Sequence, residues 1–260
     1  MSEPIDIEVA GLRKIFQPAV RSNPVVAIDK LDFKINRGEM VAIVGQTGCG
    51  KSTFLNILIG LDKPTEGSIT IGGRKPYEDF DAFRGVLATV FQQDRLLPWR
   101  SALDNVRLPL ELLGRSEQEQ IASARAWLDR LGLSNFMSAY PHELSGGMRQ
   151  RVALARAFVV EPSLLLADEA FGHLDEVTSA ALRRNFIDLA RNAGKTAIVV
   201  THQLEEAIEM GGRILVFGRP GHVLADIRLS GWSANRLANL RSDIQQMLQS
   251  NAPNPEITKH

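Results

Sequence analysis

Eight consecutive residues have the types and the spacing needed to hold a phosphate group. Residues 45–52 read Gly-Gln-Thr-Gly-Cys-Gly-Lys-Ser and fit the pattern G-x-x-x-x-G-K-[ST] at every fixed position. Glycines let backbone N–H groups surround an anion, and the helix expected after the loop directs its positive end to the same place. Lys51 can then reach the β- and γ-phosphates of a nucleotide, and the Ser52 hydroxyl can bind magnesium. A chance match is disfavoured, because a buried strand is expected before the loop and a helix after it. The predicted ATP contacts here are Gly45, Gln46, Thr47, Gly48, Cys49, Gly50, Lys51, Ser52 and Thr53.

Two adjacent carboxylates follow an apolar run further along the chain. Residues 164–167 are Leu-Leu-Leu-Ala, which reads as a buried strand, and Asp168 and Glu169 come directly after it. Asp168 is placed to support magnesium together with Ser52, as a Walker B aspartate does. Glu169 can face the γ-phosphate and accept a proton from an attacking water molecule. Alone, such a pair is as often an ordinary loop start, but the phosphate loop upstream favours the catalytic interpretation.

A third motif lies between these two and has the features of another anion site. Residues 144–151 read Leu-Ser-Gly-Gly-Met-Arg-Gln-Arg, with a serine placed to cap a helix and two glycines at the helix start. Taken together, the three motifs resemble those of the ATP-binding-cassette (ABC) ATPases, and the resemblance covers about residues 5–225. It implies that this signature motif closes over a nucleotide held by a second protomer. The signature residues implied are Leu144, Ser145, Gly146, Gly147, Met148 and Gln150.

The same resemblance implies roles for residues outside the three motifs. Gln92, directly after Phe91, looks like the Q-loop glutamine near magnesium and the attacking water, and His202 resembles the switch histidine at the γ-phosphate. Leu174 and Asp175 resemble the D-loop. The implied catalytic residues are therefore Glu169, His202 and Gln92, and the implied magnesium residues are Ser52, Gln92 and Asp168.

Three positions fit the resemblance less well. Phe16 resembles the aromatic residue that stacks on adenine, but packing in a core strand is the alternative, and residues 17–24 read as an insertion. Ala170 stands where the family commonly has proline. His173 stands where a small residue is usual before the D-loop, which leaves the packing there open.

The elements that must position these residues alternate between strands and helices. Apolar runs at 40–44, 164–167 and 196–201 read as buried strands, and helices are expected over 51–59, 179–192 and 204–210, with Gly60 ending the first of them. Strand-helix alternation implies an α/β fold with a mainly parallel sheet. The resemblance adds an N-terminal antiparallel β-subdomain and an inserted helical subdomain at about 97–160. We expect the ATPase domain to span 1–230 and a helical tail to span 231–260.

Composition places the chain among ordinary globular proteins. Its 260 residues include 30 Lys and Arg and 30 Asp and Glu, so the net charge is zero, which disfavours a general nucleic-acid binder. The single cysteine, Cys49, excludes an intrachain disulfide. The first residues lack a signal-peptide pattern, and no apolar run reaches the roughly 18 residues of a membrane helix. If the protein works at a membrane, another chain is expected to span it.

Narrower features suggest which transporter class is involved. Residues 94–99, 105–110 and 219–221 resemble the ATPases of nitrate, sulfonate and taurine importers. That resemblance implies a peripheral protein on the cytoplasmic face of the membrane that works as a homodimer with ATP and Mg²⁺. Its implied partners are a permease and, indirectly, an extracytoplasmic solute-binding protein. Leu97 and Trp99 would suit docking of a permease helix, while anchoring of the helical subdomain by Trp99 is an equal alternative.

Three other functions remain to be weighed. A soluble ABC ATPase of the repair or translation type would resemble two fused cassettes or carry a long coiled coil, and this sequence has one cassette and no heptad run. A P-loop kinase or GTPase would lack the motif at 144–151. A non-hydrolysing regulatory subunit would be expected to lose Glu169 or Lys51, and both are present.

Overall fold

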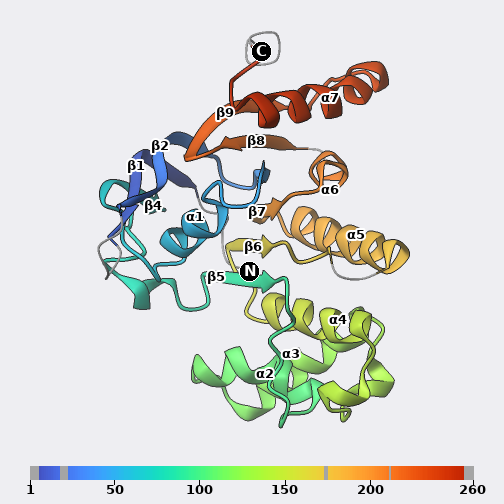
Figure 1. Cartoon of the computed structure of the whole chain (residues 1–260). Coiled ribbons are helices and arrows are strands. Elements are labelled where there is room, and N and C mark those ends of the chain that lie inside the picture. The colour runs from blue at the N-terminus through green and yellow to red at the C-terminus, as the bar shows by residue number, and fades with distance from the viewer. Residues whose placement is uncertain (1–5, 18–22, 173–174, 211, 255–260) are drawn as a thin grey trace. The chain divides into compact units, whose positions relative to one another are not determined.

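The computed structural model describes residues 6–17, 23–172, 175–210 and 212–254. The chain forms two compact units, which we call the split unit, Ile5–Ala82 with Thr196–His260, and the inserted unit, Phe83–Lys195. Each unit contains strands and helices of its own (Figure 1).

The sheet of the split unit joins an antiparallel part to a parallel part. Its strands are β1 Ile7–Phe16, β2 Val25–Ile35, β3 Met40–Gly45, β4 Glu66–Ile71, β7 Thr196–Thr201, β8 Arg213–Gly218 and β9 Gly221–Arg228. β1 pairs antiparallel with β2 and β4, whereas β3 lies between β7 and β8 and is parallel to both. β9 joins the two parts, because it is antiparallel to β8 and parallel to β2. Every residue of β3, β7 and β8 is buried, as expected for strands covered on both faces.

The described residues of the split unit form three α-helices, and the last of them packs on the parallel strands. They are α1 Lys51–Leu58, α6 Leu204–Glu209 and α7 Ala234–Ser250. Ser233 caps the start of α7 by accepting from the backbone N–H of Arg236. Leu240, Ile244 and Met247 of α7 share a buried apolar cluster with residues of β3, β8 and β9. A helical tail was expected over residues 231–260, and burial of the apolar face of α7 explains why this helix forms.

The inserted unit combines a parallel strand pair with four helices. These elements are β5 Leu87–Phe91, β6 Leu164–Asp168, α2 Ala102–Leu112, α3 Glu117–Arg130, α4 Gly146–Phe158 and α5 Glu176–Asn192. Each helix begins at a side chain that accepts a backbone N–H from its first turn, namely Ser101, Ser116, Ser145 and Asp175. Short 3₁₀ turns occur at Phe80–Phe83, Ser134–Phe136 and Pro141–Glu143.

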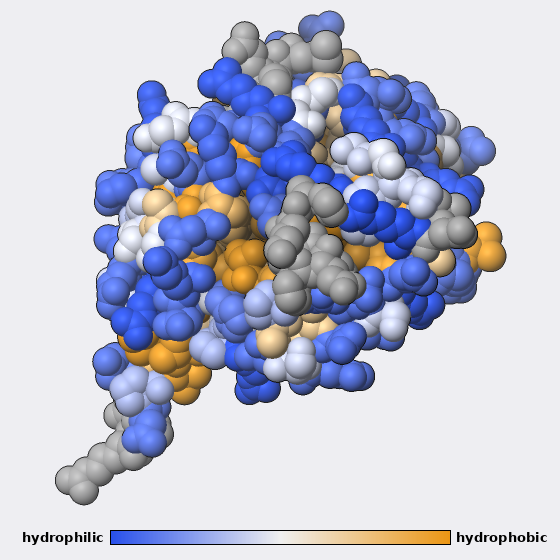
Figure 2. All heavy atoms as spheres, turned by 90° about the horizontal axis from the view of Figure 1, so that it is seen from above, coloured by the Kyte–Doolittle hydropathy of each residue, from blue (hydrophilic) through white to orange (hydrophobic). Residues whose placement is uncertain are grey.

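The predicted α/β class with mainly parallel core strands is confirmed. Polar side chains cover most of the face seen in Figure 2, and hydrophobic colour appears there in separate patches. Among the residues that the structure describes, none of the helices combines the length and apolar character needed to cross a lipid bilayer.

Candidate functional site

The phosphate loop lies between the end of β3 and the start of α1. β3 ends at Gly45, and α1 begins at Lys51. Gly50 caps the helix with φ of 97°, a left-handed conformation that favours glycine. A Cβ at Gly50 would also stand 2.5 Å from the carbonyl oxygen of Ala27, so the site requires glycine for space as well. The first backbone N–H groups of α1 point out of the helix toward the loop and favour an anion there.

The Lys51 ammonium is held inside this loop by the loop's own carbonyl oxygens. Its Nζ donates to the carbonyl oxygen of Gly45 at 2.7 Å and to that of Gln46 at 3.1 Å. The side chain is 6% exposed, so little water solvates the charge. A poorly hydrated cation bound to neutral oxygens favours an anionic ligand, which a phosphate group supplies. Ser52 is exposed and Thr53 half-buried on the first turn of α1.

Cys49 fills the underside of the loop. Its side chain is fully buried, and burial raises the pKa of the Cys49 thiol, an effect that the Lys51 charge partly opposes. A Cβ at Gly45 would lie 2.5 Å from the Cys49 sulfur, which explains why this position needs glycine. The buried thiol therefore packs against the loop, and the predicted ATP contact of Cys49, which stays a prediction, would have to come through its backbone.

In the inserted unit, three predicted residues meet at the carboxyl ends of two strands. β5 and β6 are parallel with Phe91 opposite Asp168, so Gln92, Asp168 and Glu169 emerge at one edge. Gln92 Nε2 lies 3.5 Å from Glu169 Oε2, at the long limit of a hydrogen bond. Glu169 has φ of 46°, which is uncommon for a residue with a side chain and is characteristic of functional sites.

His202 leaves the parallel sheet of the split unit at the same edge as the phosphate loop. β3 and β7 are parallel, with Val44 opposite Thr201. Gly45 and His202 therefore follow neighbouring strands at corresponding positions. His202 is exposed, and the turn after it is fixed by a hydrogen bond from the Gln203 backbone N–H to Thr201 Oγ1.

The signature motif forms the start of α4. Ser145 caps the helix, with Oγ accepting from the Met148 backbone N–H at 3.3 Å. Gly146, Gly147 and Met148 are half-buried beside it. A Cβ at Gly147 would lie 2.7 Å from Thr178 Cγ2 on α5, so this glycine lets the two helices approach closely. The open N-terminus of α4 can receive an anion.

Two signature residues face inward. Leu144 is buried, and Gln150 is 6% exposed, with Nε2 donating to the carbonyl oxygens of Ala170 at 2.7 Å and of Phe91 at 3.2 Å. Gln150 thus ties α4 to the ends of both strands that carry Gln92 and Glu169. Its predicted contact with a nucleotide stays a prediction.

Two arginines of α4 hold the segment that follows Gln92, a role that sequence patterns did not reveal. Arg149 Nε donates to Asp94 Oδ2 at 2.9 Å, and Arg149 Nη1 donates to the Leu144 carbonyl oxygen. Arg156 donates to the carbonyl oxygens of Asp94 and Arg95. Both arginines are at helical spacing on the motif-bearing helix, but only the fold brings residues 94 and 95 to them.

The D-loop prediction is described only in part. Asp175 caps α5 by accepting from the Thr178 backbone N–H at 3.0 Å, and hydrogen bonds from Thr178 lower the pKa of its carboxyl. Leu174 and His173 lie outside the described residues. Ala170, the other departure from the family pattern, is buried beneath Gln150.

Phe16 lies at the end of β1 with its ring on the surface. The side chain is 42% exposed, so packing in the core, the alternative considered for it, does not describe this position. Lys14 Nζ sits 4.9 Å from the ring centroid, and Val25 is its partner on β2. An exposed aromatic face is available for stacking, which stays a prediction.

The loop that carries Trp99 is exposed yet firmly held. Trp99 is 70% exposed, so it does not anchor the helical subdomain. Asn105 is fully buried beneath the loop, where Oδ1 accepts from the Leu97 backbone N–H at 2.8 Å. Asn105 Nδ2 lies within hydrogen-bond distance of the carbonyl oxygens of Leu97, Arg100 and Ser101.

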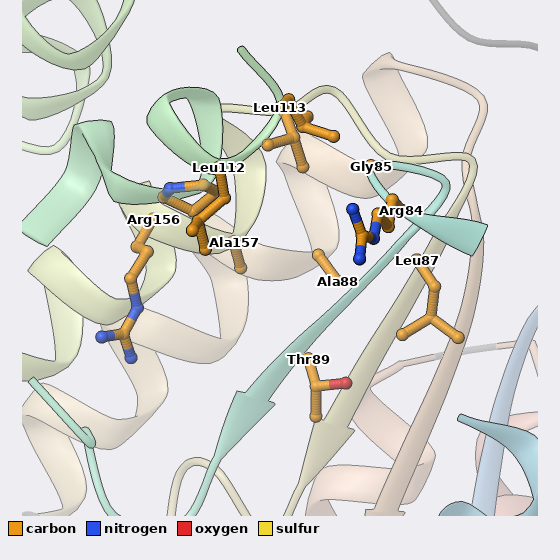
Figure 3. Close-up of a pocket in the computed structure, with 11 residues that line it drawn as sticks. Arg84, Gly85, Leu87, Ala88, Thr89, Leu112, Leu113, Arg156 and Ala157 are labelled. Carbon is orange, nitrogen blue, oxygen red and sulfur yellow. The ribbon is translucent and has the colours of Figure 1, made fainter. Parts of the chain in front are cut away.

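A cavity of about 420 Å³ opens in the same unit, between β5, the end of α2 and α4 (Figure 3). Leu87 and Thr89 extend from β5, Leu112 and Leu113 come from the end of α2, and Ala157 comes from α4. Arg84 and Arg156 also line the cavity, which therefore combines mostly apolar walls with two cationic side chains.

The predicted ATP-site residues therefore divide between the two units. The phosphate loop, Phe16 and His202 belong to the split unit, while Gln92, Asp168, Glu169 and the signature motif belong to the inserted unit.

This chain matches a protein-family model and is similar in sequence to known proteins over most of its length. A family model described as "ABC transporter" matches residues 28–172. A taurine import ATP-binding protein, TauB of Rhizobium johnstonii, is 39% identical over 91% of this chain and 94% of its own length. A nitrate import ATP-binding protein, NrtD of Synechocystis sp., is 38% identical over 86% of this chain and 82% of its own length.

Solved structures of an ATP-binding cassette also match this chain in fold and in sequence. The dimeric structure of a post-hydrolysis state of the ATP-binding cassette MJ0796, bound to ADP and Pi, matches with a TM-score of 0.77 and 35% identity. The match covers 87% of this chain and all of that one. A second dimeric structure of MJ0796, described as a bacterial ABC transporter cassette, gives a TM-score of 0.76.

Proposed function

This chain belongs to the ABC transporter family and is an ATP-binding, ATP-hydrolysing subunit, and on that premise we propose how its residues divide the work of driving import. The observation that carries the proposal is the loop between β3 and α1, where a poorly hydrated Lys51 ammonium and a helix N-terminus converge. Their combined positive potential binds the β- and γ-phosphates of ATP.

Glu169 acts as the general base. Its carboxylate accepts the proton of the attacking water. The hydrogen bond from Gln92 Nε2 helps to orient this carboxylate toward the water. The left-handed backbone at Glu169 fixes the direction in which the side chain leaves β6. His202 contacts the γ-phosphate from the end of β7, beside the phosphate loop.

Magnesium is the cofactor that this chemistry implies, and each predicted side chain carries an oxygen donor of the kind that it binds. Ser52, Asp168 and Gln92 present a hydroxyl, a carboxylate and an amide oxygen, which are the hard donors that Mg²⁺ prefers. When bound there with ATP, Mg²⁺ neutralises charge on the phosphates.

The working unit is a head-to-tail pair of cassettes. Ser145, Gly146, Gly147 and Met148 at the start of α4 receive the nucleotide held by the second protomer. The dimeric structures of the related cassette MJ0796 support this arrangement. Two identical protomers related by a two-fold axis would form two such composite sites.

A permease spans the membrane and is gripped by the inserted unit. The held loop with Trp99 and the mostly apolar cavity beside α2 and α4 suit a short permease helix. The protein then sits on the inner face of the membrane. The import proteins among its relatives favour transport over a soluble ABC ATPase and suggest taurine, nitrate or a similar small solute, delivered by an extracytoplasmic binding protein.

Replacing Glu169 by Gln tests the central assignments. Glu169→Gln keeps the shape of the side chain and removes the group that accepts the proton. We expect ATP to bind, hydrolysis to fall by at least about a hundredfold, and size exclusion to show a dimer with Mg-ATP and a monomer without nucleotide. Glu117→Gln, which changes an exposed glutamate of the same unit, should leave hydrolysis unchanged.

Two outcomes would contradict different parts of the proposal. Normal hydrolysis by Glu169→Gln would rule out this residue as the base. A monomer at saturating ATP would show that the isolated chain does not pair with itself. Adding Ser145→Arg should abolish the dimer, because a bulky cation would crowd the helix start that faces the partner's nucleotide.

A further inference from the structure

The end of α7 contacts the phosphate loop directly within the split unit. Gln46 Nε2 donates to the carbonyl oxygen of Leu248 at 2.9 Å. Gln46 is the second residue of the loop, and Leu248 lies in the last turn of the final helix. A side chain of the loop is thereby tied to a segment 202 residues away in the chain.

A second connection runs through the turn between β8 and β9, residues 218–221. Asn251, directly after α7, accepts from the Arg219 backbone N–H and donates to the Arg219 carbonyl oxygen, both at 2.8 Å. The Asn251 side chain thereby binds both polar backbone groups of Arg219, so this pair of hydrogen bonds joins the end of α7 to the turn.

The turn in its place lies against the phosphate loop. A Cβ at Gly45 would stand 2.8 Å from the Phe217 carbonyl oxygen, and a Cβ at Gly221 would stand 3.0 Å from that of Cys49. The Arg219 guanidinium lies over the loop, 3.7 Å from where a Cβ of Gly48 would be. The turn and the end of β8 therefore pack closely against the phosphate loop.

Asn251 is suited to fixing the turn. Its backbone has φ of 51°, a left-handed conformation that ends α7 and that asparagine tolerates better than most residues. Its Oδ1 would be 2.7 Å from a Cβ at Gly218, so the amide fits only because that position is glycine. The two roles of Asn251 can be separated by mutation. Glycine at position 251 would keep the left-handed backbone that ends α7 and would lose the side-chain hydrogen bonds to Arg219.

We propose that Gln46 and Asn251 form a brace by which the end of α7 holds the phosphate loop in its nucleotide-binding shape and so sets the affinity for ATP. Both act as positioning residues in this brace. Ordering a loop on binding costs free energy, and a loop that is already ordered avoids that cost. The inference rests on the proposed function, since it assumes that the loop binds ATP.

The test compares variants of the full chain by calorimetric binding of Mg-ATP and by steady-state hydrolysis. Asn251→Gly keeps the left-handed backbone and removes both side-chain hydrogen bonds. We expect its Kd for ATP to rise about two- to tenfold, as for loss of one or two net hydrogen bonds. The kcat at saturating ATP should not change, because Asn251 does not contact the groups that react.

Three further variants sharpen the result. Gln46→Met, which keeps the length but removes the donor, should also raise Kd. Asn251→Asp retains the acceptor for the Arg219 N–H but sets a carboxylate oxygen against the Arg219 carbonyl oxygen and adds a negative charge beside the phosphate loop, so its Kd should be at least as high as that of Asn251→Gly. Gln245→Ala alters an exposed residue of α7 and should leave Kd unchanged.

The possible failures are distinguishable. If the unchanged protein does not bind ATP, the proposed function fails. If it binds ATP and Asn251→Gly binds equally well, the brace is overturned while the function stands, and a lower melting temperature at equal Kd would assign the contact to fold stability alone. A lower Kd for Asn251→Gly would also overturn the brace, because the contact would then oppose binding.

Discussion

Lys51 is the residue whose charge the phosphate loop is built around. The ammonium is buried and bound by the carbonyl oxygens of Gly45 and Gln46, so the loop holds the charge in place before any phosphate arrives. A group that needs no reorganisation stabilises developing negative charge more effectively than a mobile one.

We therefore expect Lys51→Ala to lower ATP hydrolysis by at least about a hundredfold. The decrease follows from loss of the cation that faces the β- and γ-phosphates. Phosphate release from purified protein measures it, and Lys75→Ala, which alters an exposed lysine of the same unit, is the control. Near-normal turnover in Lys51→Ala would contradict the assignment of the loop.

Phe16 presents its ring at the surface, where adenine can stack. Phe16→Ala should raise the Kd for ATP by roughly two- to tenfold, because an aromatic pair contributes about 0.5–1.5 kcal/mol beyond area burial. Val25→Ala, which changes the exposed cross-strand partner of Phe16, should not alter Kd. Unchanged affinity with a lower melting temperature would assign Phe16 to fold stability instead.

Residues with a fixed local pattern were predictable, and residues that act through distant carbonyl groups were not. Lys51, Asp168 and Ser145 stand in motifs that specify their neighbours. Gln150 was assigned to a nucleotide contact from its place in the signature, yet its amide binds two carbonyl groups that only the fold brings together. Asn251 and Asn105 are solitary asparagines whose partners no spacing indicates.

At the scale of elements, Asn105 organises the loop that precedes and opens α2. Its side chain meets four backbone groups of residues 97–101 and is fully removed from water. Removing the Asn105 side chain leaves buried backbone polar groups without a hydrogen-bond partner, which costs about 1–3 kcal/mol of folding free energy. Asn105→Ala should lower the free energy of unfolding by that amount or more.

Urea denaturation measures this effect, and Asn56→Ala, at an exposed position on α1, is the matched control. Asn105→Asp should be at least as destabilising as Asn105→Ala, because it keeps the acceptor for the Leu97 N–H but sets a buried carboxylate oxygen against the carbonyl oxygens of Leu97, Arg100 and Ser101. Stability equal to that of the unchanged protein would show that water replaces the asparagine at no cost.

Element boundaries were predicted where a terminating residue was recognised. The helix expected over 51–59 is α1, Lys51–Leu58, and Gly60 follows it with φ of 81°. The helix expected over 179–192 begins earlier, at Glu176, because Asp175 caps it. The sequence drew attention to Asp175 as part of the D-loop, and its capping role was therefore missed.

At the scale of the whole molecule, the proposed ATPase site and the proposed permease-binding surface occupy different residues. Trp99 and Leu97 lie outside the phosphate site, so Leu97→Ser with Trp99→Ser should preserve ATP hydrolysis by the isolated subunit. Solute uptake and permease-stimulated hydrolysis should fall in reconstituted vesicles, because the exposed apolar contact is lost. A full loss of hydrolysis in the isolated subunit would indicate a folding role. Arg125→Ser, on the exposed surface of α3, serves as the control.

Gln150 sets a geometric condition on any movement of α4. Its amide donates to the carbonyl oxygens of Phe91, the last residue of β5, and of Ala170, two residues after β6, so two hydrogen bonds connect α4 to the end of β5 and to the turn bearing Glu169. In the proposed pair, the start of α4 rests on the nucleotide of the other protomer. Nucleotide occupancy of that neighbouring site would then affect the position of Glu169, the proposed general base of this protomer, through the side-chain amide of Gln150. The two composite sites would then be coupled, because the nucleotide state of each would affect the catalytic base of the other.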